Sequence, residues 1–204
     1  LKNPRKITID GKQGSVYRCG HKFTEVHKFT IPDCDTIKFK LDGKKILTHV
    51  NHYPDFKDEL IMSTLIKDQD DCVIPWIIFH QHLGISKFII YDNSKRGTLG
   101  NVLKDYIENG TVILFSWKFK YDKQHAQQLQ QTHAIHAFRT SKYIGLMDVD
   151  EYVNPQGDFT SILALIEHML KTHNRKYKGI SAISLQNLFF FNPKNKPYKN
   201  FKHL

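Results

Sequence analysis

The chain has little cysteine. There are three cysteines among 204 residues, Cys19, Cys34 and Cys72. An odd number, with no Cys-x-x-Cys pair and no Cys/His spacing of the kind that binds zinc, argues against a disulfide framework and a zinc site. One disulfide within the first 34 residues stays open. We expect buried free thiols and a reducing compartment.

The sequence also lacks a long apolar run. No uncharged stretch approaches the roughly 20 residues that span a bilayer, and the first residues show no signal-peptide pattern. We therefore expect no membrane segment in this chain and a cytoplasmic location, although a lumenal protein without its anchor would have the same features. Because the chain runs from Leu1 to a basic, aromatic stretch before Leu204, we expect a piece of a longer polypeptide.

Acidic residues are scarce relative to basic ones. Thirty Lys and Arg against 20 Asp and Glu give a net charge of +10, while 40% of residues are hydrophobic and 12% aromatic. A disordered basic tail is excluded by this apolar content, so we expect a folded basic protein of one domain, or a domain with a small appendage. Its partners should be anions: phosphates, nucleotides, nucleic acid or acidic surfaces. Lysines outnumber arginines 25 to 5, which favours a diffuse positive field.

Up to about Phe56 the sequence alternates short β-type runs with turn residues. Asp42-Gly43 separates two alternating runs, at 36–41 and 46–50, and this pattern predicts a hairpin. We expect a small N-terminal β-rich element over residues 1–57.

From Glu59 apolar runs alternate with segments of helical spacing, which predicts a mostly parallel α/β sheet flanked by helices over residues 58–204. The expected strands cover 60–66, 88–91, 112–117, 143–147 and 180–185. The expected helices cover 71–82, 98–109, 123–139 and 159–172. Ligands of such a sheet bind at the carboxyl ends of its strands.

The sequence Asp148-Val149-Asp150-Glu151 directly follows an expected strand. Carboxylates two residues apart at a strand end can turn toward one hard cation, and Mg²⁺ or Mn²⁺ is commonly held by one or two carboxylates, waters and a substrate's phosphate oxygens. This pattern predicts metal-assisted diphosphate chemistry. A solvated acidic turn is the alternative.

Two further strand ends should reach the same edge. Tyr91-Asp92-Asn93-Ser94 ends one strand, and its acid could accept hydrogen bonds from a ribose or a base, or simply form an Asx turn. The polar segment 67–71 ends another strand. Convergence of three strand ends strengthens the prediction of a site there.

These residues occur in an order that resembles the GT-A glycosyltransferases of family 2 and the related family 92, over about residues 59–155. The resemblance rests on Lys67-Asp68-Gln69, Trp76, His80, Leu83-Gly84, Tyr91-Asp92-Asn93-Ser94 and Asp148-Val149-Asp150-Glu151-Tyr152. It implies a GT-A, Rossmann-like fold and a nucleotide-sugar donor. Asp68 and Gln69 depart from the usual Asn-Glu, and Gln128 is followed by His133-Ala134 instead of the Asn-Asp-Cys often found there.

The resemblance also assigns roles. Asp148 and Asp150 would hold Mn²⁺ or Mg²⁺, and the residues assigned to the nucleotide are Thr64, Lys67, Asp92, Ser94 and Val149. The expected function is sugar transfer from a donor, expected to be a UDP-sugar, to the hydroxyl of a glycan or of a protein- or lipid-linked acceptor. A basic nucleic-acid-binding module and a metal-dependent nucleotidyltransferase or phosphohydrolase are the alternatives, although clustered acids repel phosphates and two-metal sites need more carboxylates.

The catalytic base is not identified by sequence. Glu151 and Asp158 are the candidates, and Glu167 is the other acidic residue in the rest of the chain. We expect the base and much of the acceptor site beyond Leu204 or on a partner chain. Such a piece would bind the donor but transfer sugar poorly.

Several other side chains have an expected role. Trp76 and His80 are interpreted as structural residues of a helix, and His133 and His136 as surface or packing residues. Trp117 ends a strand at the expected binding edge and could stack on a base or a sugar.

Overall fold

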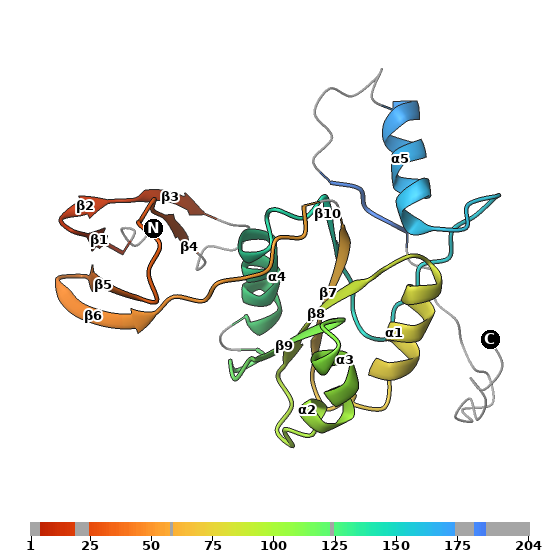
Figure 1. The fold of residues 1–204 in the computed structure, drawn as a ribbon, viewed down its shortest axis with the longest axis horizontal. Coiled ribbons are helices and arrows are strands. Elements are labelled where there is room, and N and C mark those ends of the chain that lie inside the picture. The colour runs from red at the N-terminus through yellow and green to blue at the C-terminus, as the bar shows by residue number, and fades with distance from the viewer. Residues whose placement is uncertain (1–4, 19–24, 58, 123–124, 174–181, 187–204) are drawn as a thin grey trace.

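The computed structural model describes residues 5–18, 25–57, 59–122, 125–173 and 182–186. Figure 1 shows a small β-rich part at the N-terminus and a larger part in which helices flank a second sheet. Among the described residues no helix is both long and apolar enough to cross a lipid bilayer.

The N-terminal part consists of short antiparallel strands. One sheet has the order β2-β1-β5-β6, and a separate hairpin pairs β3 with β4. The bounds are β1 Ile7–Ile9, β2 Lys12–Gln13, β3 Ser15–Arg18, β4 Glu25–Lys28, β5 Thr36–Leu41 and β6 Lys44–His49. Asp42 and Gly43 join β5 to β6 with φ angles of 50° and 85°. Positive φ at both turn residues is what a tight two-residue hairpin requires, so the predicted hairpin is confirmed.

The larger part holds a parallel four-stranded sheet in the order β10-β7-β8-β9. Its strands are β7 Leu60–Ile66, β8 Lys87–Asp92, β9 Val112–Ser116 and β10 Tyr143–Leu146. The helices are α1 Val73–His82, α2 Leu99–Val102, α3 Lys104–Glu108, α4 Ala126–Ala137 and α5 Ile162–His173. The predicted mixed α/β class is therefore observed.

Helices cover both faces of this sheet, and β7 is therefore buried along its whole length. Met62 and Ile66 belong to one core cluster with Trp76 of α1 and with residues of α2 and α5. Ile61 and Leu65, which point to the other face, belong to a second cluster with Phe138 at the end of α4. A strand with apolar side chains on both faces needs such a cover, which the continuous apolar run predicted.

The strand order also marks one position at the sheet edge. The chain builds β7, β8 and β9 outward on one side and then returns through α4 to place β10 on the other side of β7. Crevices at such a reversal, outside the carboxyl ends of the strands, are where open α/β sheets bind ligands. In this chain the reversal lies between the end of β7 and the end of β10.

Some predicted elements differ from the structure. The strand expected at 180–185 is wrong where it can be compared, because residues 182–186 have no regular structure; residues 180–181 lie outside the described part. The single helix expected at 98–109 is two short helices that meet at Leu103, since Gly100 and Asn101 are poor helix formers and Leu103 leaves helical geometry with ψ of 8°. Cys34 and Cys72 are free, as expected, but only partly buried.

Candidate functional site at the carboxyl edge of the sheet

Hydrogen bonds connect the ends of β7 and β8. The Ser94 Oγ accepts a hydrogen bond from the Asp68 N–H at 3.0 Å, and Asp92 Oδ1 accepts one from the Ser94 N–H at 2.8 Å. Asp68 has a φ of 57°, a left-handed conformation that Asp tolerates better than most residues. The Lys95 N–H returns to Asp68 Oδ1 at 3.2 Å. The two predicted strand ends thus meet in one closed arrangement.

Lys118, which follows the end of β9, adds a cation to this arrangement. Its Nζ lies 3.4 Å from Asp92 Oδ2 and donates to the Ser94 carbonyl at 2.7 Å. The Asp92 side chain is only 8% exposed, whereas the Lys118 side chain is 54% exposed. Lys118 therefore compensates a buried carboxylate while its ammonium group still reaches solvent. Lys118 is not among the residues predicted from sequence, and the signal that identifies it is its position one residue after Trp117, at a strand end.

The segment after β9 also contacts Lys67, a predicted nucleotide-binding residue. The Lys67 ammonium lies 4.7 Å from the centroid of the Tyr121 ring, a cation–π distance. The Tyr121 hydroxyl donates to Gln127 Oε1 at 3.2 Å, and Gln127 Nε2 donates to Asp148 Oδ1 at 2.9 Å. A chain of contacts therefore runs along the edge from β7, over the segment after β9, to the acidic motif after β10.

The acidic motif concentrates negative charge. Partial burial, and then the nearby charges of Glu151 and Asp150, raise the pKa of Asp148, and the hydrogen bond from Gln127 only partly offsets them. The Glu151 carboxylate accepts the Asp148 N–H at 3.0 Å, which closes the turn. Within the described residues no Lys or Arg forms an ion pair with Asp148 or Asp150.

Two buried residues of α1 hold the backbone of this motif. The Trp76 indole N–H donates to the Glu151 carbonyl at 2.9 Å. His80 Nδ1 lies 2.8 Å from the Trp76 carbonyl, and its Nε2 faces the Val153 N–H at 3.5 Å. Trp76 and His80 are both fully buried, so the expectation that they are structural is confirmed. They attach the acidic motif to a rigid helix.

Asp150 acts electrostatically on two neighbouring residues. Its charge contributes to the raised pKa of Cys72, the residue before α1, and to the raised pKa of Tyr152, in both cases after desolvation by burial. Asp148 is instead held by Gln127 of α4.

Three of the residues assigned to the nucleotide are buried. Thr64, Ser94 and Val149 are each about 1% exposed. Val149 lies in the core cluster beneath the motif, so only its backbone could reach a ligand. Thr64 Oγ1 is buried without a hydrogen-bond partner among the described residues, and the Ser94 hydroxyl is already engaged by Asp68. Lys67 is exposed and Asp92 only slightly so.

The candidate bases have different surroundings. Glu151 bonds the Asp148 N–H inside the motif. Asp158 lies in the segment between Val153 and Ile162, and both ends of this segment contact the end of α1. The Val153 N–H faces His80, and the Ile162 N–H donates to the Leu83 carbonyl. Because a ten-residue helix is about 15 Å long, this segment lies toward the opposite edge of the sheet, where α5 begins in Figure 1. Glu167 is paired with Lys142 at 2.6 Å.

The donor set at the edge suits a hard divalent cation only in part. Among the described residues, no three His, Cys, Asp or Glu side chains gather in an arrangement that could hold a metal ion. Mg²⁺, however, commonly takes one or two carboxylates and completes its shell with waters and phosphate oxygens. Asp148 and Asp150, without a cationic partner in the described part of the chain, fit that incomplete set.

A groove of about 640 Å³ adjoins this edge. It lies between the β3–β4 hairpin and α4, and its end nearest the strand ends is formed by Trp117 and Phe119. Trp117 packs against Tyr91, Phe119 and His133, and its indole N–H donates to the Ala126 carbonyl at 3.0 Å. His133 is a packing residue, as expected, and is held between the Tyr53 and Tyr91 hydroxyls at 3.2 and 2.7 Å.

Comparison with known proteins gives one consistent family. A glycosyltransferase family 92 protein of Ricinus communis is 31% identical over 98 residues, which are 47% of this chain and 16% of that protein. A family 92 protein of Oryza sativa subsp. japonica is 26% identical over 105 residues, 50% of this chain and 17% of that protein. These matches span about one sixth of the curated relatives. The sequence model of glycosyltransferase family 92 matches residues 62–204, which include the whole parallel sheet except the first two residues of β7, and the chain belongs to this family.

Proposed function

We propose that this chain is the nucleotide-sugar-binding part of a GT-A-type glycosyltransferase. In this proposal the carboxyl edge of the parallel sheet binds a nucleoside diphosphate sugar, with uridine as the expected nucleoside, together with Mn²⁺ or Mg²⁺. The sugar passes to a hydroxyl of a glycan or of a protein- or lipid-linked acceptor. Membership of family 92 supports the reaction class.

The single observation that carries the proposal is the joint placement of two kinds of charge at one edge. Uncompensated carboxylates at 148 and 150 lie at the end of β10, on one side of the reversal in strand order, and the cations Lys67 and Lys118 lie at the ends of β7 and β9. A nucleoside diphosphate with a bound divalent cation needs both signs of charge, carboxylates for the metal and ammonium groups for phosphate oxygens. Nucleic acid would be repelled by the acidic part.

Asp148 and Asp150 would hold the divalent cation, which when bound neutralises charge on the departing diphosphate. Gln127 and the Glu151 carboxylate fix the orientation of Asp148 and its turn. Trp76 and His80 fix the backbone that follows. The chain's own contribution to this step is therefore a preorganised set of anionic oxygens, which costs no rearrangement when charge develops.

Asp92 and Lys118 would serve the nucleoside and the phosphates. Asp92 is already bonded by the Ser94 N–H and Lys118, so it keeps its position whether or not a ligand is present. Lys118 is more than half exposed and could turn toward a phosphate while its contact with Asp92 loosens. This assignment separates ligand positioning at β8 and β9 from metal binding at β10.

The groove beside α4 is the place that we propose for the acceptor. Its lining mixes aromatic rings, among them Tyr17, Phe29 and Phe119, with the imidazoles of His27 and His136. Rings can cover the apolar faces of sugars, and imidazoles can bond hydroxyl groups. Phe119→Ala should raise KM for the acceptor of the whole enzyme and leave donor binding unchanged. An unchanged KM would remove the groove from the acceptor site.

The experiment that tests the donor site is a titration of the chain with UDP-sugars, with Mn²⁺ or with EDTA, followed by thermal unfolding. A ligand that binds the native state at 100 times its Kd stabilises it by about 2.7 kcal/mol, so Tm should rise only when nucleotide and Mn²⁺ are both present. Salt-sensitive binding of an oligonucleotide without any response to UDP-sugar would support the nucleic-acid alternative.

Asp150→Ala is the matched variant for this titration. Loss of one of two anionic metal ligands should cost several kcal/mol of diphosphate stabilisation, while Tm without ligand should not fall, because Asp150 is exposed and its charge repels Asp148. Asp55→Ala, an exposed acid on the segment that follows the N-terminal strands, is the control and should keep the full response. A normal Mn²⁺ response in Asp150→Ala would remove Asp150 from the metal site.

A further inference from the structure

The donor-site proposal does not use the sheet formed by β2, β1, β5 and β6, and one face of this sheet carries several lysines. Side chains alternate between the two faces of a strand, so Lys38 and Lys40 of β5 share one face. Lys45 lies directly opposite Lys40 on β6, and Leu47 lies opposite Lys38. Thr8 of β1 pairs with Lys40. This set of residues, Thr8, Lys38, Lys40, Lys45 and Leu47, is called the lysine face below.

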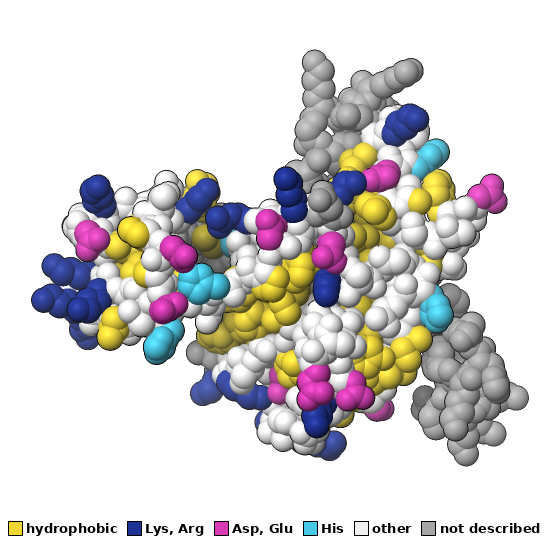
Figure 2. All heavy atoms as spheres, viewed as in Figure 1, with side chains coloured by type: hydrophobic (Ala, Val, Ile, Leu, Met, Phe, Trp, Pro, Cys, Tyr) yellow, Lys and Arg dark blue, Asp and Glu magenta, His cyan; other side chains and the backbone are white. Residues whose placement is uncertain are grey.

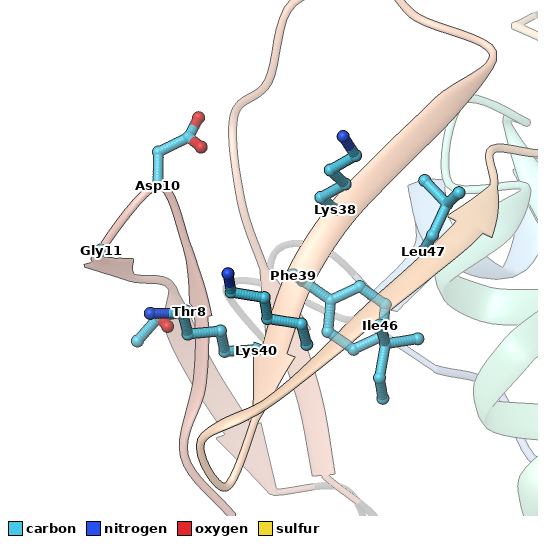
Figure 3. Close-up of a pocket in the computed structure, with 9 residues that line it drawn as sticks. Thr8, Asp10, Gly11, Lys38, Phe39, Lys40, Ile46 and Leu47 are labelled. Atoms are coloured by element: carbon cyan, nitrogen blue, oxygen red, sulfur yellow. The ribbon is translucent and has the colours of Figure 1, made fainter.

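The lysine face borders a shallow hollow of about 500 Å³. Figure 3 shows Lys38 and Lys40 extending from β5 beside it, with Asp10 at its far rim and the Phe39 ring next to Ile46. Lys38, Lys40 and Lys45 are exposed, and none of them forms an ion pair with a carboxylate in the part of the chain that the structure describes. Asp10 is the one acidic residue among those that line the hollow, so the charge of this surface is clearly positive.

This arrangement is unfavourable for the sheet itself. Like charges directly opposite each other on neighbouring strands destabilise a sheet, and Lys40 and Lys45 form such a pair. Leu47 is also unfavourably placed, because this apolar residue is 62% exposed. Both features become favourable if the face meets a partner that carries negative charge and also offers apolar contact.

We propose that the lysine face docks on an anionic phospholipid bilayer. The headgroups of such a bilayer supply phosphate and carboxylate oxygens for the three ammonium groups, and Leu47 can enter the boundary between headgroups and acyl chains. Lysines bind as separate point charges and do not require the fixed geometry that arginine forks recognise, which suits a fluid surface of many headgroups. A linear sulfated polymer would satisfy the lysines but would leave Leu47 exposed.

Figure 2 shows that Lys and Arg side chains gather at the outer end of the N-terminal part, away from the parallel sheet. Docking there would leave the carboxyl edge of the sheet accessible. The inference does not depend on the proposed donor site, since lipid binding needs neither nucleotide nor Mn²⁺.

The test is co-sedimentation of the full chain with vesicles of phosphatidylcholine alone and of phosphatidylcholine with phosphatidylserine. Each lysine near an anionic surface adds about fivefold to the affinity. The chain should therefore bind only the phosphatidylserine vesicles, in about 0.1 M salt, and be released as the salt approaches about 1 M. Binding to neither vesicle would overturn the proposal.

The variant Lys38→Glu/Lys40→Glu/Lys45→Glu should lose at least about 100-fold in vesicle affinity. A control with the same change in net charge is Lys57→Glu/Lys104→Glu/Lys171→Glu, at three exposed lysines outside this sheet, and it should stay within about threefold of wild type because a local patch, more than the total charge, governs docking. Equal losses in both variants would mean that only net charge attracts the chain to vesicles, which contradicts a docking face.

Two milder variants separate folding from docking and lipid from other polyanions. Lys40→Gln/Lys45→Gln removes the opposed charges, so it should keep or slightly raise Tm and still weaken vesicle binding about 20-fold. Leu47→Ser should weaken vesicle binding and leave retention on immobilised heparin unchanged. If the chain binds heparin through these lysines and ignores vesicles, the face serves a sulfated polymer and the lipid assignment is wrong.

Discussion

Two acidic residues at the same edge of the parallel sheet have opposite electrostatic surroundings. Asp92, at the end of β8, is nearly buried and has a partner for each carboxylate oxygen, the Ser94 N–H and the Lys118 ammonium. Asp148, just after β10, reaches solvent and has Glu151 and Asp150 as charged neighbours, which raise its pKa. The comparison teaches that the same residue type can either close a structure or remain available for a cation.

The two acids differ because their neighbouring groups come from different parts of the chain. Around Asp92 the partners come from the ends of β8 and β9, which the sheet itself aligns. Around Asp148 they come from the motif's own sequence, and the contacts with α1 and α4 fix its backbone and one oxygen without adding positive charge. A site that keeps its charge uncompensated must be held by its backbone, which is the role of Trp76.

The largest expected effect comes from removing the hydrogen bond by which Trp76 holds the backbone of the acidic motif. Trp76→Phe leaves the Glu151 carbonyl without its donor and opens space in the core, so unfolding free energy should fall by about 2–4 kcal/mol and Mn²⁺-dependent nucleotide binding should weaken as well. Chemical denaturation and nucleotide titration measure the two effects. Trp117→Phe is the control, because it removes a similar indole-to-carbonyl bond, to Ala126; it should lower stability without changing Mn²⁺ dependence.

Asp92→Ala removes the carboxylate whose two oxygens both have partners. It leaves the Ser94 N–H without its acceptor and removes the ion pair of Lys118, which keeps only its bond to the Ser94 carbonyl. The cost of about 1–3 kcal/mol lowers Tm by roughly 2–12 °C in a chain of this size. The milder Asp92→Asn should weaken UDP and UDP-sugar binding alike and keep the metal requirement. Calorimetry with both variants would contradict the assignment if Tm were unchanged in Asp92→Ala, or if the metal requirement vanished in Asp92→Asn.

The pH dependence of stability tests the role of His80, which holds the backbone after the acidic motif. Burial lowers the pKa of His80, although the hydrogen bond with the Trp76 carbonyl opposes this shift. The unfolded chain therefore takes up a proton near pH 6.5 while the folded chain does not, and stability should fall as pH drops below about 6.5, by up to about 1.4 kcal/mol per pH unit for each such histidine.

His80→Gln should flatten part of this slope. The remainder should come from His133, whose pKa is also lowered by burial. Comparing His80→Gln with His133→Gln therefore shows how much of the pH dependence comes from each histidine, one on each face of the sheet. Denaturation curves at pH 5, 6 and 7 that do not differ for the wild-type chain would contradict the assignment.

The smallest expected effect is a gain in stability. Asp148→Asn keeps an oxygen for the Gln127 side chain and removes the repulsion from Glu151 and Asp150, so Tm should rise slightly, by up to about 2 °C at pH 7. Because the pKa of Asp148 is raised in the folded chain, this gain should disappear as pH falls below about 4. A lower Tm at pH 7 would mean that Asp148 is a structural residue like Asp92.

The sequence predicts the local elements of the fold well. The apolar run at 60–66 and the Asp42-Gly43 turn are each specified by neighbouring residues, and β7 and the β5–β6 hairpin follow them. The expected strand at 180–185 fails where it is described, because an apolar run becomes a strand only when another strand pairs with it.

For the site, the order of motifs predicted which strand ends converge. It could not predict the partners that the fold brings from afar: Lys118 for Asp92, Gln127 for Asp148, and Gln130, whose side chain donates to Ser63 Oγ at 2.7 Å in the core. These contacts join residues 21 to 67 positions apart, and no local pattern encodes such distances. The resemblance assigns Val149 to the nucleotide, and the turn that follows β10 places its side chain in the core, so only its backbone could meet a ligand.

The most direct test of the central difference is calorimetric titration of UDP in the presence of Mn²⁺ and in EDTA, on the wild-type chain, Asp92→Asn and Asp150→Ala. We predict that the wild-type chain binds UDP more tightly with Mn²⁺, that Asp92→Asn binds more weakly in Mn²⁺ but keeps a large gain from the metal, and that Asp150→Ala loses this gain. If Asp150→Ala keeps the gain and Asp92→Asn loses it, the metal lies at β8, and the division of roles between the two acids is wrong.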